Sequence, residues 1–130
     1  MKVTLACCQM PVSEDLEANL KTAEHYIDTA VNKGAQIVLL PEMFCCPYDN
    51  SCFPVYAQPV DGEIATRMSH AAKKHGIYLF AGSFPEKEGD HIYNTCLVFD
   101  RQGKQIGRHR KAHLFDIDVE GGVSFRESDI

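Results

Sequence analysis

Residues 35–42 read Ala35-Gln36-Ile37-Val38-Leu39-Leu40-Pro41-Glu42. The side chains between Gln36 and Pro41 are all apolar, which is typical of a strand covered on both faces in a parallel or mixed sheet flanked by helices. Glu42 follows at the carboxyl end of this strand. Because α/β folds usually place their sites at that edge of the sheet, the stretch predicts an α/β fold with a carboxylate at its functional edge.

The segments around this stretch predict further strands and helices. Residues 3–9 form an apolar strand that stops near Pro11, because proline removes a ladder donor. Ser13 suits the N-cap of a helix with apolar residues at steps of three or four, and Gly34 ends that helix. Residues 45–59 show no clean period and predict a loop with at most a short helix, which either lines a pocket or packs as a plain connection.

The second half of the chain predicts one helix and an antiparallel meander. Asp61 suits the cap of a helix over residues 62–75, which Gly76 ends. Turns are expected at residues 85–90 and 100–103. Closely spaced strands are expected at residues 77–84, 92–99 and 104–108.

Composition sets the class of protein. With 130 residues and 45% apolar content, residues 1–130 are expected to form one domain with a buried core. The net charge of −5 argues against nucleic-acid binding. The sequence has no apolar run long enough to cross a membrane and no signal peptide at its start, so a cytoplasmic location is expected without membrane attachment.

The six cysteines are expected to be reduced rather than paired. Cys7, Cys8 and Cys96 lie in apolar strand-like runs, which predicts buried thiols. The remaining cysteines and nearby histidines are not expected to bind zinc, because no C-x-x-C pair occurs and no His follows at finger spacing. We therefore expect neither a metal nor a cofactor.

A basic run, Arg108-His109-Arg110-Lys111, closes this acidic chain. If the fold brings Lys111 to Glu42, each charge offsets part of the desolvation of the other, and their pKa values depend on their mutual geometry. General acid/base pairs are built in this way. The alternative is that Glu42 caps a helix or strand and that the basic run is a solvated edge.

Two stretches resemble motifs of the nitrilase, or carbon-nitrogen hydrolase, superfamily. They are Leu39-Leu40-Pro41-Glu42-Met43-Phe44 and Arg110-Lys111-Ala112-His113-Leu114-Phe115-Asp116. The continuation through Asp116-Ile117-Asp118-Val119 and Phe125-Arg126-Glu127-Ser128 is similar to the omega-amidase branch. The resemblance runs the whole length of the chain. It implies a layered α-β-β-α sandwich, of which this chain is the amino-terminal part, and it implies subunits that pair through their helical faces as a homodimer.

The resemblance also implies residue roles and a substrate class. Family members cleave amides or nitriles with a Glu-Lys-Cys triad. Glu42 matches the general base, and Lys111 matches the cation that steadies the tetrahedral oxyanion. Glu127 falls where the family has a second glutamate that orients the lysine and the substrate. The small-molecule substrate implied by the omega-amidase branch is the terminal amide of a dicarboxylate monoamide such as 2-oxoglutaramate.

The triad cysteine does not carry over to this chain. In the family it lies beyond the lysine, after another strand, and none of the six cysteines matches that position. Cys45 and Cys46 lie near Glu42 in sequence, but a nucleophile must reach both partners, and packing is the expected role of these thiols.

Two functions are therefore kept open. The first is the amino-terminal part of an omega-amidase-like hydrolase, inactive as the isolated chain. The second is a non-catalytic domain that keeps the fold for oligomerisation or ligand binding. In the first case apolar faces and a sheet edge are expected to lie uncovered, which makes the chain prone to associate, whereas a monodisperse monomer would favour the second.

Overall fold

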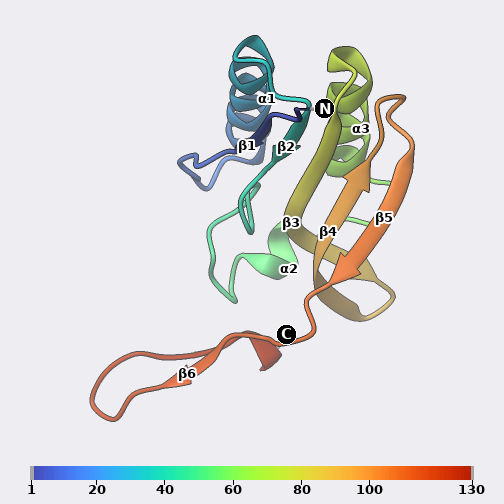
Figure 1. The fold of residues 1–130 in the computed structure, drawn as a ribbon. Coiled ribbons are helices and arrows are strands. Elements are labelled where there is room, and N and C mark those ends of the chain that lie inside the picture. The colour runs from blue at the N-terminus through green and yellow to red at the C-terminus, as the bar shows by residue number, and fades with distance from the viewer. Residues whose placement is uncertain (1, 130) are drawn as a thin grey trace.

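The protein is described by a computed structural model, which covers residues 2–129. Its body is one five-stranded sheet with helices, and a two-stranded hairpin extends from the body as an arm (Figure 1). In chain order the elements are β1 Leu5–Cys7, α1 Leu16–Asn32, β2 Ile37–Leu39, α2 Phe53–Tyr56, α3 Glu63–His75, β3 Tyr78–Glu88, β4 His91–Phe99, β5 Gln105–Arg110, β6 Asp116–Asp118, β7 Ser124–Arg126 and a 3-10 helix, η1, at Glu127–Asp129.

The large sheet is mixed, with strand order β1-β2-β3-β4-β5. β1, β2 and β3 run parallel, whereas β3, β4 and β5 form the antiparallel meander expected from their spacing. The smaller sheet pairs β6 with β7 and was not anticipated. The α/β prediction is confirmed.

The charged turn expected at residues 85–90 is mostly strand. β3 continues through Glu88, and Glu86 pairs with Tyr93 of β4. The side chain of Glu86 is 1% exposed and forms ion pairs with Arg108 and Arg110 of β5. Because these partners neutralise a carboxylate in the sheet, the charged segment can remain extended, and the turn shortens to Gly89 and Asp90.

Both predicted helices form, but their caps differ from those expected. Asp15 caps α1, since its carboxylate accepts from the backbone N–H of Ala18 at 3.0 Å, whereas Ser13 bonds to Asn19. The N-cap of α3 is Gly62 and not Asp61. No side chain forms a capping hydrogen bond at this helix start. Capping depends on the angle at which the chain enters the helix, which the spacing of apolar residues does not specify.

The helices cover only one face of the sheet. On this face Val38, Leu79 and Phe99 lie in one cross-strand row and are at most 3% exposed, packed in the core with residues of α1 and α3. The expectation that β2 is covered on both faces is wrong within residues 2–129. On its other face Ile37 and Leu39 are half-buried.

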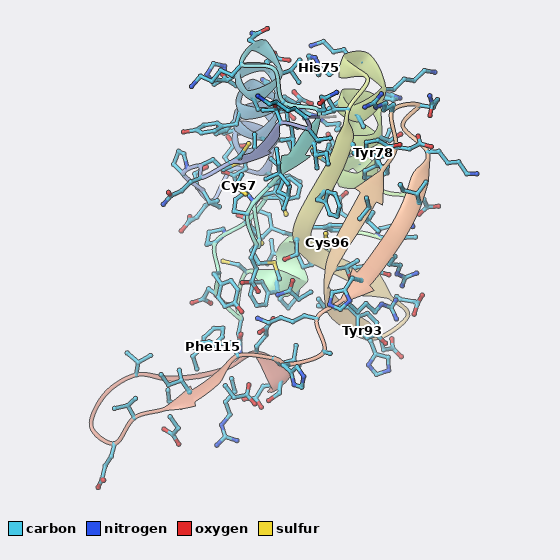
Figure 2. All side chains as sticks on the ribbon, in the orientation of Figure 1. Cys7, His75, Tyr78, Tyr93, Cys96 and Phe115 are labelled. Atoms are coloured by element: carbon cyan, nitrogen blue, oxygen red, sulfur yellow. The ribbon has the colours of Figure 1, made fainter. Side chains whose placement is uncertain are left out.

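We call this second side the open face and define it by its apolar residues. Leu5 and Tyr78 flank Ile37 in one row and are 54% and 37% exposed. Figure 2 shows Tyr78, Cys7 and Cys96 spread over the sheet. Residues 2–129 contain no second large sheet to cover this side. The open face consists of Leu5, Cys7, Ile37, Leu39, Tyr78, Phe80, Cys96 and Val98.

The same geometry corrects the expected burial of three thiols. All six cysteines are free, but Cys7 is exposed, and Cys8 and Cys96 are half-buried. Cys7 and Cys96 lie on the open face, which no second large sheet covers within residues 2–129. Across residues 2–129, no helix combines the length and apolarity needed to cross a membrane.

Candidate active site

Glu42 lies in a turn after β2 that two hydrogen bonds fix to β3. The backbone N–H of Met43 donates to Oγ of Ser83 at 3.2 Å, and that of Phe44 donates to the Ser83 carbonyl at 3.2 Å. Met43 is buried and has a φ of 51°, which is an unfavourable region for a residue with a long side chain. Such strain persists only where surrounding contacts enforce it, so the direction of Glu42 is closely defined.

Lys111 follows β5 on the same side of the molecule. Its backbone N–H donates to the carbonyl of Asn94 at 2.8 Å, which extends the ladder between β4 and β5. Its Nζ lies 2.9 Å from Oε1 of Glu42 and 2.9 Å from Oε2 of Glu127. The structure therefore brings together the three residues singled out in the sequence, although their catalytic roles stay predictions.

Glu127 is a buried carboxylate whose side chain is only 4% exposed. Oε2 accepts from Lys111 at 2.9 Å, from the Tyr48 hydroxyl at 2.9 Å and from the Phe115 backbone N–H at 2.7 Å. Oε1 accepts from Asn94 at 2.8 Å. Burial alone would raise the pKa of Glu127, but the hydrogen bonds from Asn94 and Lys111 outweigh it and lower that pKa.

Asn94 joins the two carboxylates and was not anticipated as a site residue. Its Nδ2 donates to Oε1 of Glu42 at 2.8 Å and to Oε1 of Glu127 at 2.8 Å. Asn94 and Lys111 thus each touch both acids and close a ring, which we call the carboxylate ring: Glu42, Asn94, Glu127 and Lys111. One available signal was an amide beside the apolar residues of a predicted strand, since buried polar groups need partners.

Tyr48 completes the surroundings of Lys111 and was also missed. The Nζ of Lys111 donates to the Tyr48 hydroxyl at 3.2 Å. The Tyr48 ring packs against Phe53 and Phe125 at centroid distances of 5.5 and 5.6 Å. Its pKa is raised to about 12, chiefly by burial. Burial alone would lower the pKa of Lys111. The hydrogen bonds to Glu42, Glu127 and Tyr48 outweigh burial and raise this pKa above its ordinary value.

The two carboxylates differ in their capacity to take a proton. Glu127 uses both oxygens in hydrogen bonds, so protonation would break contacts that fix Lys111. Glu42 has a side chain that is 49% exposed, and both of its bonds fall on Oε1. Among residues 2–129, Oε2 of Glu42 has no hydrogen-bond partner. The ring therefore presents one basic oxygen beside one fixed cation, which is a suitable pair for proton transfer and oxyanion stabilisation.

Comparison with known proteins identifies the family of this chain. The family model for carbon-nitrogen hydrolases matches residues 4–130. The chain belongs to the carbon-nitrogen hydrolase family. Its sequence is 48% identical over 128 residues to omega-amidase NIT2 of Xenopus tropicalis, covering 98% of this chain and 46% of that protein. It is 42% identical over 132 residues to a chloroplastic omega-amidase of Arabidopsis thaliana, covering 98% of this chain and 36% of that protein.

Solved structures of the family share this fold. The C. elegans NitFhit protein superposes with a TM-score of 0.78 at 30% identity, covering 98% of this chain and 33% of that one. Saccharomyces cerevisiae Nit3, a member of branch 10 of the nitrilase superfamily, superposes with a TM-score of 0.73 at 35% identity. The match covers 79% of this chain and 41% of that one. The chain spans less than half the length of these relatives.

Two cavities meet at Lys111 in this carbon-nitrogen hydrolase chain. One, of about 290 Å³, also contains Glu42, Ser83, Cys96 and His109 and opens on the sheet. The other, of about 260 Å³, contains Glu127 and is lined largely by apolar groups of β4 and of the segment after β5. Within residues 2–129, no group of three or more His, Cys, Asp or Glu side chains is arranged to hold a metal ion.

The thiols are poorly placed to serve as the family nucleophile. Cys45 and Cys46 are 0% and 1% exposed and pack in the core. A hydrogen bond with Cys46 and burial raise the pKa of Cys45. Cys96 does line the cavity with Glu42, but burial raises its pKa, and its sulfur lies against the backbone of Gly82, where an added Cβ would be 2.4 Å away.

Proposed function

We propose that this chain supplies the general base and the oxyanion cation of an omega-amidase-like hydrolase. The complete reaction would convert the terminal amide of a small dicarboxylate monoamide, such as 2-oxoglutaramate, to the acid and ammonia. The observation that carries the proposal is the carboxylate ring, in which Lys111 contacts two acids at 2.9 Å and Oε2 of Glu42 remains free of protein bonds in residues 2–129. The omega-amidases at 42% and 48% identity support the substrate class.

Glu42 and Lys111 have separate roles in this proposal. Glu42 takes the proton of a nucleophilic thiol, and the sulfur attacks the amide carbon. Lys111 stabilises the oxyanion that forms on the carbonyl oxygen. Glu42 returns the proton to the nitrogen, the C–N bond breaks, and ammonia leaves a thioester. Water then cleaves the thioester with Glu42 as the base, which restores the thiol and releases the acid.

We place the nucleophile outside the six cysteines of this chain. The burial of Cys45 and Cys46 and the contact of Cys96 with Gly82 support this assignment. The isolated chain should accordingly release no ammonia from 2-oxoglutaramate above a Glu42→Ala control. Turnover that depends on Glu42 in the isolated chain would contradict the assignment and make Cys96 the first candidate for the nucleophile.

The test of the function uses the longest open reading frame that contains these residues. Ammonia release from 2-oxoglutaramate is measured for the unaltered protein and for Glu42→Gln and Lys111→Met. Each change is expected to reduce kcat/KM by at least about 100-fold, as for loss of a general base or an oxyanion donor. Glu14→Gln and Lys33→Met, at exposed positions, are the matched controls. Full activity in Glu42→Gln would exclude the proposed base.

The open face supports a second proposal, which concerns association. Exposed apolar groups such as Leu5 and Tyr78 on one side of a sheet favour burial against another protein surface. We propose that the chain forms homo-oligomers, with a dimer as the smallest. We also propose a cytoplasmic location, because six free thiols are typical of a reducing compartment.

A further inference from the structure

Lys111 has no spare donor in this structure. A lysine ammonium has three N–H groups and no acceptor. Nζ of Lys111 meets three oxygens, at 2.9 Å to Glu42, 2.9 Å to Glu127 and 3.2 Å to the hydroxyl of Tyr48. A substrate oxygen can therefore bind Lys111 in the normal hydrogen-bonding range only if one of these contacts is released.

The three contacts differ in strength. All three bonds have a charged donor, but the two carboxylate contacts also join opposite charges, which adds Coulombic attraction that the contact with Tyr48 lacks. The contact with Tyr48 is the longest and joins the cation to a neutral oxygen. It is thus the contact that is released at the lowest cost in free energy.

Release of this contact leaves Tyr48 supported. Its own hydroxyl proton is donated to Oε2 of Glu127 at 2.9 Å, a bond that does not involve Lys111. Its ring remains packed between Phe53 and Phe125. The ammonium lies on a flexible four-carbon stem, so a small tilt of the side chain can direct the freed N–H toward an oxygen in the cavity that Lys111 shares with Glu42.

We propose that the carbonyl oxygen of the amide accepts the Lys111 N–H that the hydroxyl of Tyr48 accepts in this structure, and that substrate binding breaks the contact between Lys111 and Tyr48. This inference rests on the proposed function for the identity of the oxygen. Tyr48 is then a positioning residue. It satisfies the third donor of Lys111 before substrate arrives, and it weakens ground-state binding by the free energy of the hydrogen bond between the ammonium and its hydroxyl.

The test measures binding to the 130-residue chain, so it does not depend on turnover. Glutarate monoamide is the omega-amide probe, and dimethyl sulfoxide is a neutral oxygen acceptor that cannot be hydrolysed. Titrations follow the NMR signal of the Lys111 ammonium. In Tyr48→Phe, which keeps the ring, each probe is expected to bind about 10- to 100-fold more tightly, which corresponds to the net value of one hydrogen bond that involves a charged group. Tyr26→Phe, which changes a tyrosine of α1 at a different cavity, should bind as the unaltered chain does.

A purely structural role predicts the opposite sign, because damage to the site weakens binding. Equal or weaker binding of both probes to Tyr48→Phe would overturn the inference. If only dimethyl sulfoxide binds, and binds more tightly to Tyr48→Phe, the inference stands and the proposed amide substrate fails. If both probes bind the two proteins equally, the proposed substrate stands and the role of Tyr48 fails. If neither probe moves the Lys111 signal in either protein, Tyr48 is not displaceable and the inference also fails.

A second measurement uses the unaltered chain, so it tests the inference even if the Tyr48→Phe variant folds poorly. The ring carbon that carries the Tyr48 hydroxyl reports its hydrogen bonds. Displacement requires that this signal and the Lys111 signal shift together, with the same dissociation constant, as either probe is added. A shift of Lys111 with an unmoved Tyr48 would exclude displacement.

Discussion

Nδ2 of Asn94 donates a 2.8 Å hydrogen bond to Oε1 of Glu42, and the same nitrogen lies 2.8 Å from Oε1 of Glu127. Two carboxylates are thereby held near each other by one neutral amide. Their repulsion is offset by Lys111 on one side and by the two amide hydrogens on the other. The separation of the acids therefore depends on a strand residue that carries no charge.

Replacement of Asn94 should destabilise the fold and the ring together. Asn94→Leu leaves Oε1 of Glu127 without a donor, whereas Oε1 of Glu42 keeps its bond from Lys111, and an unsatisfied buried acceptor costs about 1–3 kcal/mol. We expect the unfolding free energy to fall by about that amount, measured by urea denaturation with an unchanged slope. Asn94→Asp adds a third carboxylate to the site. It should lower the unfolding free energy more at pH 7 than at pH 4. The reverse order of pH sensitivity would contradict this account.

Acid should weaken the fold partly through Glu127. Its pKa is lower in the folded protein than in the unfolded chain, so its stabilisation is present above the unfolded value of about 4.3 and is lost as the pH falls through the folded value. Glu127→Gln should flatten the dependence of unfolding free energy on pH below about 5. Glu120→Gln, at an exposed position of the arm, serves as the control and should leave the slope unchanged.

Loss of the cation should affect stability even in a chain without turnover. Lys111→Met leaves Glu127, whose side chain is 4% exposed, without its charged partner. Because hydrogen bonds to charged groups contribute about 1.5–3 kcal/mol, we expect a loss of that size by chemical denaturation. The pKa of Glu127, followed by carboxyl NMR, should rise at the same time. A stable variant with an unmoved Glu127 signal would refute the proposed pairing energy.

The open face should cause the chain to associate. Burial of a few hundred Å² of apolar surface contributes several kcal/mol at about 25 cal/mol per Å². We expect oligomers by light scattering and binding of a hydrophobic dye. Leu5→Glu should reduce both signals because Leu5 lies on the open face. Val55→Glu changes a residue of α2 that is 76% exposed and should change neither signal. A monodisperse monomer that ignores the dye would favour a self-sufficient domain.

Much of the fold could be predicted because apolar spacing and turn residues act locally. The long helices and the meander follow from such patterns, and Glu42 was expected at the end of a strand. The fixed partners of Lys111 could not all be predicted. Asn94 reaches the acids only through the register of β4, which shifts at a bulge between Gly82 and Phe84 of β3. Tyr48 reaches Lys111 from a loop without periodicity, so only the folded chain reveals the contact.

The arm is closed where it leaves the body. The backbones of Phe115 and Glu127 bond there, with the Glu127 N–H donating to the Phe115 carbonyl at 3.1 Å, and Ser128 bonds to Asp116. The residues between these two bonded ends form a closed loop. Its length has little effect on the free energy of closure, since each doubling of loop length costs only about 0.6 kcal/mol. Related chains can therefore vary the tip of the arm, and with it the outer surface they present, while inheriting the position of Glu127 unchanged.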